Sequence, residues 1–200
     1  MLQRDTEFDV AATSSGDDGQ QADIDKFERV LTSYLAGEVD EDVVRVFRLH
    51  NGIYGQRQGG HNQMVRVKLP YGGITAEQLD MMAHIADEYS RGWGHLTTRQ
   101  NVQFHFVELE RVPEVMRDLA SVGLTSREAC GDAVRNVMGC HLAGACPKEH
   151  LDITPWAQAA YRHFGIVAAR AGAGQELFDA PADAAPPPAS PVPPPGTGRR

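Results

Sequence analysis

The segment of this chain with the most side chains that could bind or react is residues 95–109, HLTTRQNVQFHFVEL. Side chains alternate between two faces along a β-strand. Read as one strand, this segment places apolar residues on one face, namely Leu96, Val102, Phe104 and Phe106. The other face carries hydrogen-bonding groups and one cation, namely His95, Thr97, Arg99, Asn101, Gln103 and His105. Such a row indicates either a binding surface or a strand face that is simply solvated, and alternation alone does not decide between them.

Three further cations extend this polar surface. Arg66 and Lys68 share one face of an expected strand over residues 64–69, and Arg135 lies in the segment VRNVMG. An arginine guanidinium binds carboxylates and small oxyanions through paired N–H donors. If this face binds a ligand, we expect a polycarboxylated cofactor or a small anion, and a merely solvated strand face remains the alternative.

Strand and helix patterns alternate in the part of the chain that must position these side chains. Thr75 and Gln78 form a capping box that predicts a helix, with an apolar stripe of Leu79, Met82, Ala86 and Tyr89. The remaining expected elements are a helix from Asp23 to about Gly37, a helix from Pro113 to Gly123, a short strand over 134–138 and a helix over 156–164. This order predicts an α+β fold in which helices cover one face of a small sheet.

Composition separates a foldable body from two expected tails. Residues 1–22 are predicted to be a disordered acidic leader, and residues 1–44 hold twelve acidic against three basic side chains. Residues 171–200 are predicted to be a disordered Ala/Pro-rich tail, because eight of the twelve prolines follow residue 180. The part of the chain that is expected to fold is therefore residues 23–165.

The bulk properties exclude several classes of protein. A net charge of −8 argues against general nucleic-acid binding. No apolar run is long enough for a membrane span, and the polar start lacks a secretory signal. Three cysteines fit a reducing compartment. We therefore expect a cytoplasmic protein with no membrane or nucleic-acid partner.

Several segments together resemble the N-terminal half of ferredoxin-type nitrite and sulfite reductases. They are RLHNGIYGQRQ (48–58), MVRVKLPYGG (64–73), GHLTTRQNVQFHFVEL (94–109), GLTSREACGDAVRNVMGC (123–140) and LAGA (142–145). The resemblance implies a ferredoxin-like half-domain over about 45–122 and the start of a siroheme-binding domain over about 123–165.

The resemblance also implies an oxidoreductase that converts nitrite to ammonia or sulfite to sulfide, without indicating which. The family uses siroheme and a 4Fe-4S cluster, and ferredoxin or a similar donor supplies electrons. Arg66 and Arg135 match the family's substrate-pocket arginines. The segment that contacts siroheme carboxylates is matched by Thr97, Thr98, Arg99, Gln103 and His105, while Lys68 and His95 stand where relatives often have arginine.

The resemblance fails at the cluster. Its cysteines follow C-x5-C and C-x3-C spacings that this chain lacks as a set. Five residues lie between Cys140 and Cys146, as in the first spacing, but the pair directly follows RNVMG. We therefore expect Cys140 to be a buried thiol typical of the family and Cys146 to be incidental, and no metal ligand is assigned. We therefore expect a fragment that is inactive alone, with a tail that a frameshift or premature stop would explain.

Two alternatives remain open. One is a truncated, non-catalytic half-domain. The other is an RNA-binding ferredoxin-like module, which would require Phe104 and Phe106 to be exposed for base stacking.

Overall fold

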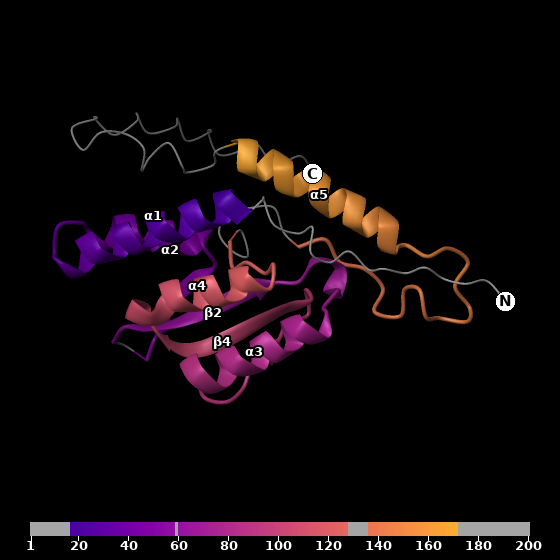
Figure 1. Cartoon of the computed structure of the whole chain (residues 1–200), viewed down its shortest axis with the longest axis horizontal. Coiled ribbons are helices and arrows are strands. Elements are labelled where there is room, and N and C mark those ends of the chain that lie inside the picture. Colours follow the sequence, from indigo (N-terminus) through magenta and orange to yellow (C-terminus); the bar gives the residue numbers. More distant parts are fainter. Residues whose placement is uncertain (1–16, 59, 128–135, 172–200) are drawn as a thin grey trace, which may run out of the picture.

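A computed structural model describes residues 17–58, 60–127 and 136–171 (Figure 1). These described residues form a four-stranded sheet in the order β1-β2-β4-β3. The strands are β1 (Ile53–Gly55), β2 (Asn62–Lys68), β3 (His95–Leu96) and β4 (Asn101–Glu108). Since β4 is antiparallel to both β2 and β3, the latter two run parallel, with α3 (Ala76–Tyr89) between them in the chain. This split β-α-β arrangement confirms the predicted α+β class.

The core lies between one face of the sheet and the helices. The other helical elements are α1 (Asp17–Leu35), α2 (Glu41–His50), α4 (Val112–Ser121), α5 (Thr154–Ala171), and the 3-10 helices η2 (Pro70–Gly72) and η3 (Leu109–Arg111). α3 packs on β4 and α4, and α1 packs on α4 (Figure 1). The most deeply buried side chains come from these elements: Ile24, Phe27, Val65, Val67, Ile85, Phe104, Val107, Val112, Val115 and Leu119.

The first and last helices, α1 and α5, extend beyond their predicted bounds. α1 begins at Asp17, so residues 17–22 of the expected leader are helical. Gln20 Nε2 donates to the Leu124 carbonyl oxygen at 2.7 Å, which ties this first turn to the body. α5 continues beyond the predicted end at 164, to Ala171. The rest of both expected tails, residues 1–16 and 172–200, lies outside the described residues.

α2 was not among the helices predicted from the sequence. Asp40 caps it, since its side chain accepts from the backbone N–H of Asp42 at 2.8 Å. Val44 and Phe47 face the core, and the Phe47 ring stacks on Phe27 with centroids 5.6 Å apart. The Asp40 cap was the signal available in the sequence.

The capping box of α3 is confirmed. Thr75 and Gln78 exchange side-chain and backbone hydrogen bonds at 3.1 Å each. The predicted stripe is partly wrong, because Leu79 is 58% exposed whereas Ile85 and Gln78 are buried. Gln78 can be buried because its Nε2 donates to the Val122 carbonyl oxygen at 3.0 Å.

The expected single strand over 95–109 is wrong, because the chain turns back at residues 97–100. His95 pairs with Gln103 and Leu96 with Val102, so these residues lie on neighbouring strands. The turn closes through Gln100 N to Thr97 O (3.1 Å), and Gln100 has a left-handed φ of 55°. Alternation therefore holds within β4 but not across the turn.

A β-bulge shifts the faces again near the end of β4. The β2–β4 register moves between Gln63 and Val65, and Phe106 has a φ of 65°. Val107 is consequently buried at 0% exposure, whereas Phe106 leaves the core face on which alternation had placed it. Gln56 Oε1 accepts from the Phe106 backbone N–H at 2.7 Å and so satisfies the bulged backbone.

The predicted strand over 134–138 is not found in its described part, residues 136–138. This segment instead lies against η2, where the Tyr71 backbone N–H donates to the Val137 carbonyl oxygen at 2.8 Å. Residues 134 and 135 lie outside the described residues.

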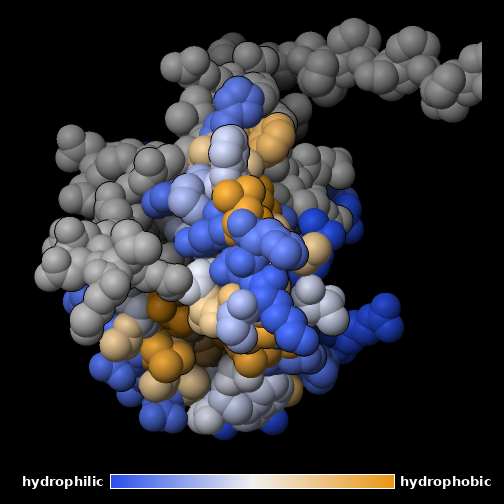
Figure 2. Space-filling view, turned by 90° about the vertical axis from the view of Figure 1, so that its right-hand side faces the viewer, coloured by the Kyte–Doolittle hydropathy of each residue, from blue (hydrophilic) through white to orange (hydrophobic). Residues whose placement is uncertain are grey.

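The surface on the right-hand side of Figure 1 carries hydrophobic residues interspersed with hydrophilic ones (Figure 2). Between residues 136 and 171, several large apolar side chains are exposed: Met138, Leu142, Leu151, Trp156 and Phe164. The core therefore leaves much of this segment's apolar surface uncovered. In the described part of the chain, no helix combines the length and apolarity needed to cross a membrane.

We expect Gly52→Ala to destabilise the fold far more than Gly37→Ala. Both glycines have left-handed φ values, 74° and 77°, so either alanine costs about 1–2 kcal/mol. A Cβ at Gly52 would also lie 2.1 Å from the Ser126 carbonyl oxygen, whereas one at Gly37 meets nothing within 4 Å. Overpacking should add a further ~1–3 kcal/mol at Gly52 only. Urea unfolding of both variants measures the difference, and equal losses would contradict the close approach.

Candidate functional site

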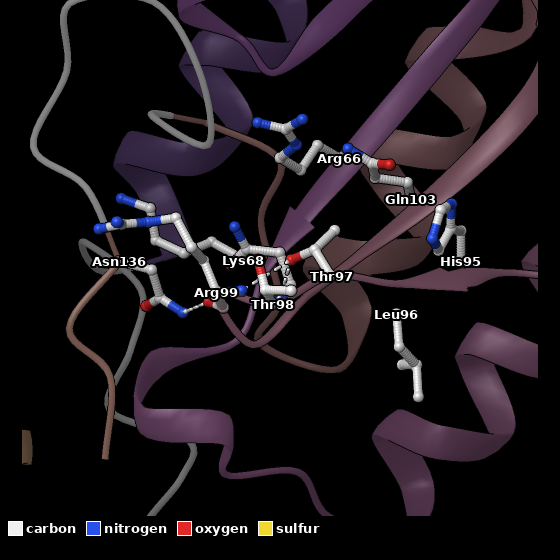
Figure 3. Close-up of a pocket in the computed structure, with 10 residues that line it drawn as sticks. Arg66, Lys68, His95, Leu96, Thr97, Thr98, Arg99, Gln103 and Asn136 are labelled. Atoms are coloured by element: carbon white, nitrogen blue, oxygen red, sulfur yellow. Dashed lines mark hydrogen bonds between the residues drawn. The ribbon is translucent and has the colours of Figure 1, made fainter.

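A polar depression of about 370 Å³ lies on the face of the sheet opposite the helical core (Figure 3). β2, the β3–β4 hairpin and the segment that follows residue 135 all contribute to its wall. The lining residues are Arg66, Lys68, His95, Leu96, Thr97, Thr98, Arg99, Asn101, Gln103 and Asn136.

The lining is cationic. Arg66, Lys68 and Arg99 contribute positive charge, and none of the described lining residues is acidic. Hydroxyl and amide groups surround these cations. Such a set of donors without a competing carboxylate is suited to bind an anion.

Arg66 is held in a defined orientation by two neighbours. In the amide orientation that satisfies hydrogen bonding, Gln103 Oε1 accepts from Arg66 Nε at 2.9 Å. Arg66 Nη1 also donates to the Tyr54 hydroxyl at 3.3 Å, and the guanidinium lies 5.1 Å from the Tyr54 ring centroid. Gln103 can reach Arg66 because the two residues pair across β2 and β4.

Lys68 is the most buried cation of the depression, with only 4% of its surface exposed. Its Nζ lies 5.8 Å from the ring centroid of Tyr161 on α5. The reduced dielectric of a buried position strengthens the attraction between an ammonium group and an anion. Lys68 therefore adds to the electrostatic attraction at the floor of the depression.

The Thr97 hydroxyl organises the hairpin turn. Thr97 Oγ1 accepts from the backbone N–H groups of Arg99 (3.3 Å) and Asn101 (3.1 Å). Thr98 and Arg99 are exposed at the tip of this turn. The turn thus presents a hydroxyl and a guanidinium to a ligand at the mouth of the depression, whereas Leu96 points away from the other labelled side chains (Figure 3).

Five of the seven residues that the sequence nominated are brought together here: Arg66, Thr97, Thr98, Arg99 and Gln103. Lys68 and His95 join them. Arg135 lies outside the described residues. Asn136 was missed, since a lone asparagine after Arg135 carries no sequence signal of its own.

His105, the remaining predicted site residue, does not line the depression. Its ring stacks on Trp93 with centroids 5.4 Å apart, and Gln56 Nε2 lies 3.0 Å from its Nδ1. Its Nε2 is buried and has no hydrogen-bond partner within residues 17–58, 60–127 and 136–171. Burial lowers the pKa of His105, and the charge of the neighbouring His95 lowers it further.

Two of the three cysteines lie in the described part of the chain. Cys140 is exposed, so the expectation of a buried thiol is wrong, and Cys146 is half-buried. Cys130 lies outside the described residues. Among the described residues, no three His, Cys, Asp or Glu side chains converge as a metal site would require.

The aromatic residues of β4 do not form a base-stacking surface. Phe104 is 1% exposed and belongs to the helix-facing core. The Phe106 ring is covered by Arg91, whose guanidinium carbon lies 3.5 Å from its centroid. The arrangement therefore does not favour the RNA-binding alternative.

Comparison with known proteins confirms the expected resemblance. Residues 54–122 match the family described as the nitrite/sulfite reductase ferredoxin-like half domain. A sulfite reductase [ferredoxin] of Mycobacterium tuberculosis is 38% identical over 122 residues, which cover 53% of this chain and 22% of that protein. The chloroplastic ferredoxin–nitrite reductase of Spinacia oleracea is 41% identical over 107 residues, 52% of this chain and 18% of that protein.

A solved structure shows the same fold. The Mycobacterium tuberculosis NirA protein aligns with a TM-score of 0.62 and 32% identity, covering 72% of this chain and 30% of that chain. This chain therefore matches less than a third of the length of each of these relatives.

We expect His105 to make folding stability depend on pH. Because its folded-state pKa lies below that of an unfolded histidine, the unfolded chain binds the proton more readily. Its contribution is fully present above the unfolded pKa and declines as the pH falls from about 7.5 to about 5.5. The free energy of unfolding of His105→Gln should fall less over this range than that of the wild type.

Urea unfolding at each pH checks this expectation. Between about pH 7.5 and about pH 8.5, where histidine is neutral in both states, the two proteins should show the same pH dependence. Equal declines at low pH would contradict the assigned burial of His105.

Proposed function

We propose that this chain, whose residues 54–122 match the nitrite/sulfite reductase ferredoxin-like half domain, supplies the anion-facing part of a siroheme-dependent nitrite or sulfite reductase. The observation that carries the proposal is the convergence of Arg66, Lys68 and Arg99 in one depression, where the lining residues that the structure describes include no acidic side chain.

The donors of the depression fit a polycarboxylated tetrapyrrole. Arg99 and Thr98 are exposed on the hairpin turn, where carboxylates at the edge of a large ring could reach them. The Thr97 hydroxyl accepts two backbone hydrogen bonds and keeps its own hydrogen for a carboxylate. When bound, siroheme would supply the iron at which nitrite or sulfite is reduced.

Arg66 and Lys68 suit the smaller anion. Arg66 is pre-oriented by Gln103 and Tyr54, so little reorganisation accompanies anion binding. Lys68 adds a second positive charge from the floor of the depression. Together they would attract nitrite or sulfite, and their N–H groups would stabilise negative charge as oxygen leaves.

The names of the relatives support a proposal for the electron donor of the complete reaction. The Mycobacterium tuberculosis and Spinacia oleracea proteins are named as ferredoxin-dependent enzymes. We propose that ferredoxin or a similar donor supplies the electrons here too, through a 4Fe-4S cluster for which no ligand is assigned in this chain.

We expect the full chain to bind uroporphyrin, a metal-free polycarboxylate porphyrin, saturably and less tightly at higher salt. Arg99→Ala should weaken this binding about tenfold or more, because a charge-assisted hydrogen bond contributes about 1.5–3 kcal/mol. Fluorescence titration measures both effects. Siroheme itself, followed by its absorbance, should show the same ranking of variants.

Arg45→Ala is the matched control. Arg45 is an exposed arginine on α2 that pairs with Asp42 at 3.1 Å and does not line the depression. Its loss removes the same charge from the chain and should leave porphyrin affinity nearly unchanged. The proposal fails if the wild type shows no saturable binding, or if both arginine variants lose affinity equally.

A further inference from the structure

Two amide side chains connect the hairpin turn at 97–100 to the segment 136–139. The Asn136 amide nitrogen donates to three carbonyl oxygens: Leu69 (2.7 Å), Arg99 (3.0 Å) and Gln100 (3.2 Å). Asn136 is only 6% exposed. One buried group therefore holds the residue after Lys68 and the backbone of Arg99 together, which fixes the spacing between two cations of the depression.

Gln100 makes the reciprocal connection. Its Nε2 donates to the Gly139 carbonyl oxygen at 3.0 Å, and its Oε1 accepts from the Gly139 backbone N–H at 3.1 Å. Both polar atoms of the amide are thus used on one backbone unit. Figure 3 shows the Asn136 amide directed at the backbone of this turn, beside Arg99.

The local backbone conformation is one that non-glycine residues rarely adopt. Gln100 has a φ of 55° and Tyr71, which donates to the Val137 carbonyl oxygen at 2.8 Å, has a φ of 46°. Each such residue costs on the order of 1–3 kcal/mol unless its surroundings enforce the conformation. The hydrogen bonds from residues 136–139 are surroundings of this kind.

We propose that Asn136 and Gln100 are positioning residues, which hold the 97–100 turn so that Arg99 faces the ligand of the depression. The inference rests on the proposed function, because it assigns these residues a task in anion binding. Neither amide needs to touch the ligand. Each acts by reducing the number of conformations that the Arg99 backbone must give up on binding.

The test compares Gln100→Gly and Asn136→Ala, each alone and combined with Arg99→Ala. We call the hydrogen bonds of Asn136 and Gln100 to the backbone the clamp. Glycine adopts a φ of 55° without strain, so Gln100→Gly removes the Gln100 part of the clamp while keeping the backbone conformation accessible. The readouts are uroporphyrin affinity by fluorescence titration and amide hydrogen exchange at residues 99 and 101. These two N–H groups are hydrogen-bonded to Thr97 Oγ1 within the turn.

Each clamp variant should weaken porphyrin binding about tenfold and change it less than about twofold when Arg99 is already alanine, since residues that act through one another are not additive. The exchange of the amides at 99 and 101 should accelerate in Gln100→Gly and Asn136→Ala. Arg99→Ala should weaken binding without accelerating exchange at residue 101.

Gln78→Ala is the control for general destabilisation. It removes half of the α3 capping box and the hydrogen bond to Val122, and it does not line the depression. It should lower the melting temperature without changing porphyrin affinity or the exchange of the turn.

Two results would overturn the inference. One is wild-type affinity in both clamp variants, and the other is an equal loss of affinity with and without Arg99. If the wild type itself binds no porphyrin, the proposed function fails and the positioning role fails with it. The hydrogen-exchange comparison then still decides whether the clamp holds the turn.

Discussion

The antiparallel pairing of β2 with β4 is the constraint on which the rest of this structure depends. It sets Val65 opposite Phe104 on the core face, and Arg66 opposite Gln103 on the other. A slip of one residue in either strand would exchange the two faces and direct cations into the apolar core. The hydrophobic effect on one face therefore enforces the arrangement of charges on the other, and the cationic depression follows from the register that buries the valines.

The same pairing explains why the two irregularities lie where they do. The hairpin turn ends the β3–β4 pairing and brings Thr97 and Arg99 to the edge of the depression. The bulge near Phe106 lets Val107 return to the core. The Phe106 backbone N–H donates to Gln56 Oε1. His105 does not line the depression and packs against Trp93. Site and core thus share β4 on its two opposite faces.

Sequence reasoning succeeded where local chemistry specifies structure. The capping box of α3 and the alternation in β2 depend on residues within a few positions of each other, and both were predicted. The turn after Leu96 was not predicted, because no glycine or proline marks it. Gln100 has a left-handed φ there, and its side chain is hydrogen-bonded to Gly139, which is distant in the sequence. Leu79 and Phe106 were misassigned for a related reason, since long-range packing rather than periodicity decides which face is covered.

The site shows the same division between local and distant information. Arg66 and Arg99 could be nominated from residue type and a family resemblance, because guanidinium groups have few roles on a sheet face without acidic neighbours. Asn136 could not, because its significance lies in three carbonyl groups that come from two other segments of the chain. An amide that satisfies backbone acceptors is ordinary by type and becomes specific only through position. Where several cations line one depression, like charges repel. Uncharged neighbours such as Asn136 therefore contribute to its geometry by fixing the backbone that carries those charges.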